Sequence, residues 1–206
     1  LSTAHVYDKK FEGLINEQSP TLNNNPYALA NLEGERVIRK IFGNDPNSSI
    51  ILRLSNIFGY PNRKEVNCWM LFINNICKEI VQNQTITIKS NPLLNRDFIS
   101  MIDFCEIIKK VSESKFIDKG KNIVNLGSEN SVSLLNCANY IKDIYQIKYQ
   151  KEVQIILKEK MESENDFIFC NQFLEENNLN IKFQKNFDIE IEDLFKKCIE
   201  FFVTKS

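Results

Sequence analysis

Apolar residues recur along the chain with two kinds of spacing. Where they return every three or four residues, they predict one face of an amphipathic helix. We predict helices over residues 26–43, 65–83, 102–112, 132–146, 166–178 and 190–203. Short β-branched or alternating runs predict strands over residues 49–54, 85–89, 123–126 and 152–158, and residues 1–7 read as the end of a strand. Strands that alternate with helices indicate an α/β protein.

Local signals set several of these boundaries. Pro26 suits the first turn of a helix, and Gly43 suits the position just after its end. The run SIILRL at 49–54 is typical of a strand buried on both faces of a parallel sheet, and NIFGYP at 56–61 is expected to break it. Residues 8–25 are polar and rich in turn formers, so we expect a loop there.

Charge and hydropathy exclude two classes of partner. The formal net charge is −1, with lysines and glutamates interspersed, whereas a nucleic-acid site needs a concentrated basic face. No apolar run approaches 18 residues, so no membrane span is expected. We therefore predict a cytoplasmic protein that binds neither nucleic acid nor membrane.

The six cysteines are scattered, and no two form a CxxC pair. Because His5 is the sole histidine, a Cys/His zinc cluster cannot form, and we predict no metal site. Five of the cysteines fall on apolar faces of predicted helices, where a free thiol behaves as a small hydrophobe. Reduced, buried thiols are expected.

Two groups of polar side chains lie where α/β proteins place their ligands. Ser2 and Thr3 follow a strand end, and the carboxyl ends of parallel strands form the usual binding edge. Tyr27 lies in a helical first turn, where the positive end of the helix dipole favours a phenolate. Taken alone, such residues are more often structural than catalytic.

Five motifs in a fixed order change that interpretation: STAHVY, PYALANLEGE, ILRLSNIFGYP, RDFISMIDF and VNLGSENSVSL. Together they resemble the extended short-chain dehydrogenase/reductase family. More narrowly, they are similar to the NAD-dependent epimerase/dehydratase group that acts on nucleotide sugars. The resemblance runs from Leu1 to about Val203.

The resemblance implies a partial Rossmann-like fold, a doubly wound parallel sheet, with an interleaved smaller α/β lobe. Residues 1–60 and 96–127 would form the rest of the dinucleotide-binding domain, and residues 61–95 and 128–206 the nucleotide-sugar lobe. None of the six glycines matches the family's GxxGxxG turn. We therefore expect the N-terminal cofactor half to be absent, and NAD or NADP to be bound mainly by a segment outside this chain.

The resemblance also assigns roles around the reacting carbon of a nucleotide sugar. Thr3, with Ser2 beside it, would hydrogen-bond the reacting hydroxyl or carbonyl, and Tyr27 would act as acid and base. In the family a lysine one turn after the tyrosine holds the nicotinamide ribose and activates the phenol. This chain has Asn31 there, which can bind a ribose hydroxyl but carries no charge.

Three more residues match positions that bind the substrate. Asn56 matches an asparagine that contacts the sugar nucleotide near its pyrophosphate, and Arg96 an arginine that clamps the pyrophosphate. His5 falls where dehydratases of the group carry an acidic residue, and Ala4 precedes it. Because the acidic pair is absent, water elimination is less favoured than epimerisation or reduction.

Two functions remain open at this stage. The first is an NAD(P)-dependent nucleotide-sugar epimerase or reductase, with a role in surface-polysaccharide biosynthesis. The second is a family member that binds a nucleotide sugar or dinucleotide without turnover, which the replacement of lysine by Asn31 favours. The resemblance further implies a possible homodimer, packed through helices that include the one carrying Tyr27.

Overall fold

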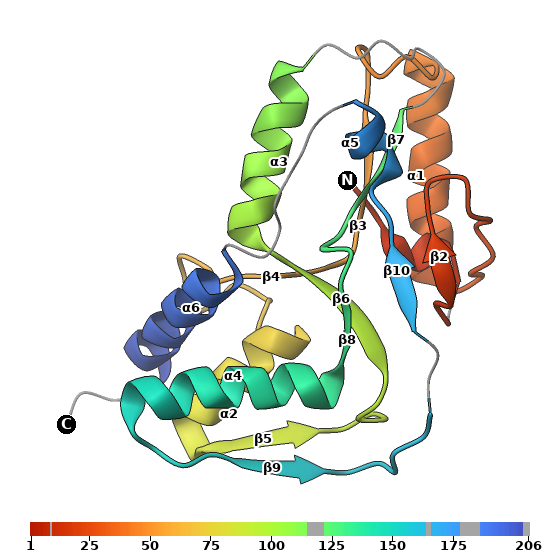
Figure 1. Cartoon of the computed structure of the whole chain (residues 1–206). Helices are drawn as coiled ribbons and strands as arrows, with labels where there is room; N and C mark the ends of the chain where they lie inside the picture. The colour runs from red at the N-terminus through yellow and green to blue at the C-terminus, as the bar shows by residue number, and fades with distance from the viewer. Residues whose placement is uncertain (9, 115–121, 164–165, 178–185, 204–206) are drawn as a thin grey trace.

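The computed structural model describes residues 1–8, 10–114, 122–163, 166–177 and 186–203 (Figure 1). Its helices are the 3₁₀ turn η1 (Ala4–Val6), α1 (Pro26–Phe42), α2 (Phe72–Asn83), α3 (Met101–Glu113), α4 (Leu134–Tyr149), α5 (Gln172–Glu176) and α6 (Phe187–Phe202). Its strands are β1 (Ser2–Thr3), β2 (Gly13–Ile15), β3 (Ile51–Leu54), β4 (Asn56–Phe58), β5 (Thr85–Ile88), β6 (Asn95–Ser100), β7 (Ile123–Leu126), β8 (Ser131–Ser133), β9 (Gln154–Leu157) and β10 (Phe167–Phe169). The predicted α/β class is confirmed.

Strands β1, β3 and β7 form a parallel sheet in that order. Ser2 lies opposite Arg53, which in turn lies opposite Asn125. Helices α1 and α3 stand on opposite sides of β3 and β7 (Figure 1), and Ile107 and Val111 of α3 are buried in one cluster with strand side chains. A parallel sheet with helices on both sides is the doubly wound arrangement, as predicted.

The chain then leaves this sheet and builds a second layer. The amide of Ser55 donates the last bond to β7, and Asn56 instead pairs with Phe98 in the parallel pair β4–β6. Strand β8 adds to β6 in antiparallel fashion. The strand over 49–54 does end before residue 56, as expected, but residues 56–58 form a separate strand that was not predicted, because their backbone groups find new partners on β6.

The second predicted helix begins later than the apolar pattern suggests. It starts at Phe72 rather than near residue 65, and Leu71 before it has an extended backbone. Residues 66–71 form turns instead, in which the amide of Leu71 donates to the carbonyl of Cys68. The Trp69 indole donates to the Lys64 carbonyl and its ring packs on Phe202, so this residue is partly buried without a helix.

Five strands were not predicted: β2, β4, β6, β8 and β10. Strands β2 and β10 pair in parallel, and β8 contributes three residues to β6. Strand β10 also replaces the first part of the helix predicted over residues 166–178, of which only Gln172–Glu176 is helical. Residue 178 lies outside the described residues. The three-residue strands among them are too short for their own alternation to be distinctive, and β6, with the sequence NRDFIS, does not alternate.

The expectation of buried helical thiols is correct for three cysteines and wrong for the other three. Cys77, Cys137 and Cys198 are buried in α2, α4 and α6. Cys105 is exposed on α3, while Cys68 and Cys170 are half-buried outside helices. All six are free, so no disulfide constrains the chain.

Candidate functional site

Most of the predicted site residues meet at one pocket, which we call the Tyr27 pocket. It encloses about 220 Å³ at the carboxyl ends of β1 and β3 and the start of α2. Five of the seven predicted residues line it: Ser2, Thr3, His5, Tyr27 and Asn56. Asn31 and Arg96 are not among the lining residues. The location agrees with the rule that α/β sheets bind ligands beyond the carboxyl ends of their strands.

Thr3 and His5 are held by the turn that follows β1. The buried Thr3 caps η1, and its Oγ1 accepts the amide of His5 at 3.2 Å. Asn23 fixes the same turn, because its amide donates to the His5 carbonyl at 2.7 Å. Since the Thr3 hydroxyl is an acceptor toward the turn, its own proton is available for a ligand in the pocket.

The His5 imidazole is half-buried and lies 6.4 Å from the Tyr27 ring, centroid to centroid. Burial lowers the pKa of His5 from its usual 6.5, and the positive charge of Arg96 lowers it further. His5 is therefore neutral at pH 7 and can either donate or accept a hydrogen bond, depending on its tautomer.

Tyr27 projects from the first turn of α1 and is 61 % exposed. The helix starts here because Asn25 accepts the amide of Ala28 at 2.8 Å and Pro26 occupies the first turn. One turn later, the Asn31 side chain donates to the carbonyl of Tyr27 at 2.9 Å. Among the described residues that line the pocket, none is a lysine or arginine.

Ser2 belongs to a buried polar network that the sequence did not reveal. Its hydroxyl donates to Glu35 at 2.5 Å, and Glu35 is bound by Arg53 through bonds of 2.9 and 2.6 Å. The Arg53 guanidinium lies 4.8 Å from the centroid of the Tyr7 ring, and the Tyr7 hydroxyl donates to Asn125 at 2.6 Å. Because its proton is used by Glu35, Ser2 can offer only acceptor capacity to a ligand.

One sequence signal could have indicated this network. Arg53 stands in an otherwise apolar strand, and a charged side chain on a two-sided buried strand needs a buried partner. Burial raises the pKa of Tyr7 to about 12, so this second tyrosine is a hydrogen-bonded neutral phenol.

Asn56 and Arg96 are placed by β4 and β6. The Asn56 amide donates to the Asp97 carbonyl at 2.9 Å, which ties the pocket wall to β6. Arg96 donates to the backbone carbonyl of Asn95 at 2.9 Å, and its charge reaches His5. The two residues predicted to contact a pyrophosphate therefore lie on neighbouring, paired strands.

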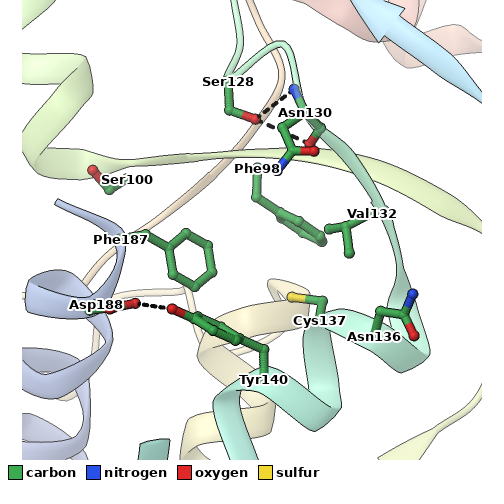
Figure 2. A pocket seen from close by; sticks show the side chains of 10 residues that line it. All are labelled: Phe98, Ser100, Ser128, Asn130, Val132, Asn136, Cys137, Tyr140, Phe187 and Asp188. Carbon is green, nitrogen blue, oxygen red and sulfur yellow. Dashed lines mark hydrogen bonds between the residues drawn. The ribbon is translucent and has the colours of Figure 1, made fainter. Parts of the chain in front are cut away.

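A larger cavity lies elsewhere, which we call the α4–α6 cavity (Figure 2). It encloses about 450 Å³ and is lined by Phe98, Ser100, Ser128, Asn130, Val132, Asn136, Cys137, Tyr140, Phe187 and Asp188. No predicted site residue lines it, and Phe98 is the one residue that it shares with the Tyr27 pocket.

Two further features bear on function. Over the described ranges, no group of three or more His, Cys, Asp and Glu side chains could hold a metal ion. In the same part of the chain, no helix is both long and apolar enough to cross a bilayer.

Solved structures with the same fold are found among sugar-nucleotide enzymes. UDP-N-acetylglucosamine 4-epimerase from Methanobrevibacter ruminantium M1, in complex with UDP-N-acetylmuramic acid, is similar with a TM-score of 0.75 and 17 % identity over 97 % of this chain and 61 % of that chain. UDP-glucuronic acid 4-epimerase from Bacillus cereus, in complex with UDP-glucuronic acid and NAD, is similar with a TM-score of 0.71 and 18 % identity over 98 % of this chain and 60 % of that chain. RMD from Pseudomonas aeruginosa, complexed with NADPH, is similar with a TM-score of 0.73 and 16 % identity over 97 % of this chain and 65 % of that chain.

The chain spans about 60 % of the length of these structures. At such identities the likeness concerns the fold alone, but sequence adds independent information. The model of the NAD dependent epimerase/dehydratase family matches residues 1–127, which is more than half of the chain. The chain therefore belongs to the NAD dependent epimerase/dehydratase family.

Proposed function

We propose that this chain carries the substrate-facing half of an NAD(P)-dependent nucleotide-sugar epimerase or reductase. The observation that supports this most is that Thr3, His5, Tyr27 and Asn56 meet at one pocket beyond the carboxyl ends of β1 and β3. Related structures contain UDP-sugars with NAD, or NADPH. We further propose a cytoplasmic role in the biosynthesis of surface polysaccharides.

Tyr27 at the pocket and Asn31, one turn further along α1, suit a nicotinamide nucleotide. The Tyr27 side chain is exposed, and Asn31 donates one amide proton to the Tyr27 carbonyl, which leaves its oxygen to accept from a ribose hydroxyl. Tyr27 and Asn31 would thus hold the nicotinamide ribose. A bound nicotinamide would supply the hydride acceptor and donor for the sugar carbon.

The chain's own residues would then move the proton. Tyr27 takes the proton of the reacting sugar hydroxyl while the carbon loses its hydride, and returns it when the ketone is reduced. Thr3 donates to the same oxygen and orients it. Asn56 and Arg96 hold the pyrophosphate, a role that suits a guanidinium fork.

The competing function is binding without turnover. It is favoured by one specific observation, which is that the Asn31 amide turns to the Tyr27 carbonyl and no cationic side chain lines the described pocket. The lysine that the family places one turn after the tyrosine is thus replaced by a neutral side chain.

The experiment uses the full-length protein that contains this chain, incubated with NAD⁺ or NADP⁺ and a panel of UDP-, GDP-, dTDP- and CDP-sugars. Sugar products are separated by chromatography and reduced cofactor is followed at 340 nm. We expect turnover with at least one sugar, and Tyr27→Phe should lower kcat by about 10² to 10⁴-fold with little change in substrate binding. Binding without product would establish the competing function, and absence of binding would contradict both.

A matched pair of variants tests the missing charge. Asn31→Lys should raise kcat at pH 7 by about tenfold or more, because a cation beside the phenol favours its ionised form. Asn83→Lys, at the exposed end of α2, adds the same charge away from the pocket and should leave kcat unchanged. Equal effects of the two variants would show that only the net charge matters.

A second copy of the chain is the proposed protein partner. Helix α1 buries only Ala28 and Glu35, and leaves an apolar surface exposed at Leu29, Val37, Ile38, Ile41 and Phe42. Such a surface on the helix that carries Tyr27 suits a helix-to-helix dimer contact.

A further inference from the structure

The α4–α6 cavity combines aromatic walls with a single charge. Figure 2 shows the rings of Phe98, Phe187 and Tyr140 around one space, and the centroids of the Phe187 and Tyr140 rings are 5.9 Å apart. Among the described lining residues, Asp188 is the only one with a charged side chain, and none is a lysine or arginine. The volume of the cavity, about 450 Å³, is within the usual range for small-molecule sites.

The three hydroxyl groups of the cavity donate their protons to protein carboxylates, so toward a ligand they can act only as acceptors. Tyr140 donates to Asp188 at 2.8 Å, Ser100 to Asp103 at 2.6 Å and Ser128 to Asp97 at 2.9 Å. Each hydroxyl has one proton, which a carboxylate in this arrangement already binds. Ser100 and Ser128 also accept the backbone amides of Asp103 and Asn130, so one lone pair on each of these oxygens, together with those of the Tyr140 oxygen, remains for a ligand. This favours a ligand that brings hydrogen-bond donors.

The local charge selects the sign of that ligand. A carboxylate beside aromatic faces attracts a cation through Coulomb and cation–π interactions. The same environment disfavours phosphates, for which a different groove, lined by Lys89, Lys158 and Lys160 beside two glutamates, is better suited. The α4–α6 cavity is thus chemically unlike a nucleotide site.

We propose that the α4–α6 cavity binds a small organic cation, a primary ammonium group carried on an apolar body. The ammonium would lie beside the hydrogen-bonded pair, in contact with the Asp188 carboxylate and the Tyr140 oxygen, and the apolar body would pack on Phe98, Val132 and Cys137. This site goes beyond the proposed nucleotide-sugar function and uses none of the residues assigned to it.

Isothermal titration of the full chain with three probes of one shape tests the proposal. 2-Phenylethylamine is cationic at pH 7, 2-phenylethanol is neutral and phenylacetate is anionic. We expect the amine to bind at least about tenfold more tightly than the alcohol, which corresponds to about 1.4 kcal/mol, and phenylacetate not to bind measurably. Equal affinity for the amine and the acid, or no binding of the amine, would overturn the proposal.

Two variants locate the site on α6. Asp188→Asn keeps the shape and the acceptor for Tyr140 but removes the charge, so it should weaken the amine about tenfold and leave the alcohol unchanged. Asp193→Asn removes a charge from the same helix, where Asp193 pairs with Lys196, and should leave both affinities unchanged. Should Asp193→Asn weaken the amine as much as Asp188→Asn, the binding would be a general charge effect and the site assignment would be wrong. Val132→Phe fills the cavity and should abolish binding; retained binding would contradict the assignment.

Discussion

Around the sheet β1–β3–β7 the buried side chains include a continuous polar network, which consists of Ser2, Tyr7, Glu35, Arg53 and Asn125. Between α2, α4 and α6 the buried side chains are apolar: this apolar core includes Ile76, Ile80, Ile141, Leu194 and Phe195. The side chains of both regions are buried. The stability of the polar network depends on matched hydrogen-bond donors and acceptors, whereas that of the apolar core depends on the contact area.

The difference bears on where chemistry can be built. A polar network is satisfied in few arrangements, whereas an apolar core tolerates repacking with modest loss of stability. The network joins α1 to β1 through the bond from Ser2 to Glu35, and Thr3 is the other residue of β1. We infer that the network fixes the Tyr27 pocket, and that the apolar core stabilises the layer behind it.

The largest expected effect is from breaking the ion pair of the network. Glu35→Ala leaves Arg53, which is 4 % exposed, without its carboxylate, and should lower the free energy of unfolding by about 3 to 5 kcal/mol. Urea denaturation followed by circular dichroism measures the loss, and hydrogen exchange should place it mainly in β1, β3 and β7.

Two controls separate charge from packing in that result. Glu33→Ala breaks the exposed pair with Arg36 on the same helix, and should cost less than about 1 kcal/mol. The double variant Glu35→Leu with Arg53→Met removes both charges and should be more stable than Glu35→Ala. A double variant that is no more stable would mean that the buried charge is not the cause.

The next largest effect is expected in the apolar core. Ile141 on α4 is fully buried, so Ile141→Ala should cost about 2 to 5 kcal/mol through lost contacts and a residual cavity. Ile147→Ala on the same helix is the control, because Ile147 is 75 % exposed, and should change stability by less than about 0.5 kcal/mol. If the Ile141 variant lost protection mainly in β1 and β3, the two regions would not be distinct.

The sequence predicted the apolar core better than the polar network. Helices α4 and α6, which contribute to this core, follow from their periodic apolar residues. Helix α1 lies outside the core, and its bounds follow from the local signals Pro26 and Gly43. The pairing of β10 with β2 joins segments about 150 residues apart, and three-residue strands carry no distinctive pattern. The partner of Arg53 could not be predicted either. Glu35 reaches it only because of the face that α1 turns to the sheet, and that face is determined by packing.

For the candidate site, the sequence predicted which residues take part but not how their side chains are oriented. Motif order assigned the residues, and five of them line one pocket. The orientation of Asn31 toward the Tyr27 carbonyl is a side-chain choice that spacing does not determine. The same holds for Ser2, whose proton is taken by Glu35, a residue with no assigned role in the sequence.

The smallest loss of stability is expected from removing a hydroxyl group from one of the two tyrosines near β1. Tyr7→Phe removes the donor to Asn125 and leaves a buried amide oxygen without it, so stability should fall by about 1 to 3 kcal/mol. Tyr27→Phe removes a hydroxyl from a side chain that is 61 % exposed, and should change the unfolding free energy by less than about 0.5 kcal/mol. Thermal and urea unfolding measure both, and equal losses would contradict the assignment of Tyr7 to structure and Tyr27 to chemistry. A hydroxyl that can be removed from Tyr27 without loss of stability is one that the fold does not need, and this is the property expected of a group available to a substrate.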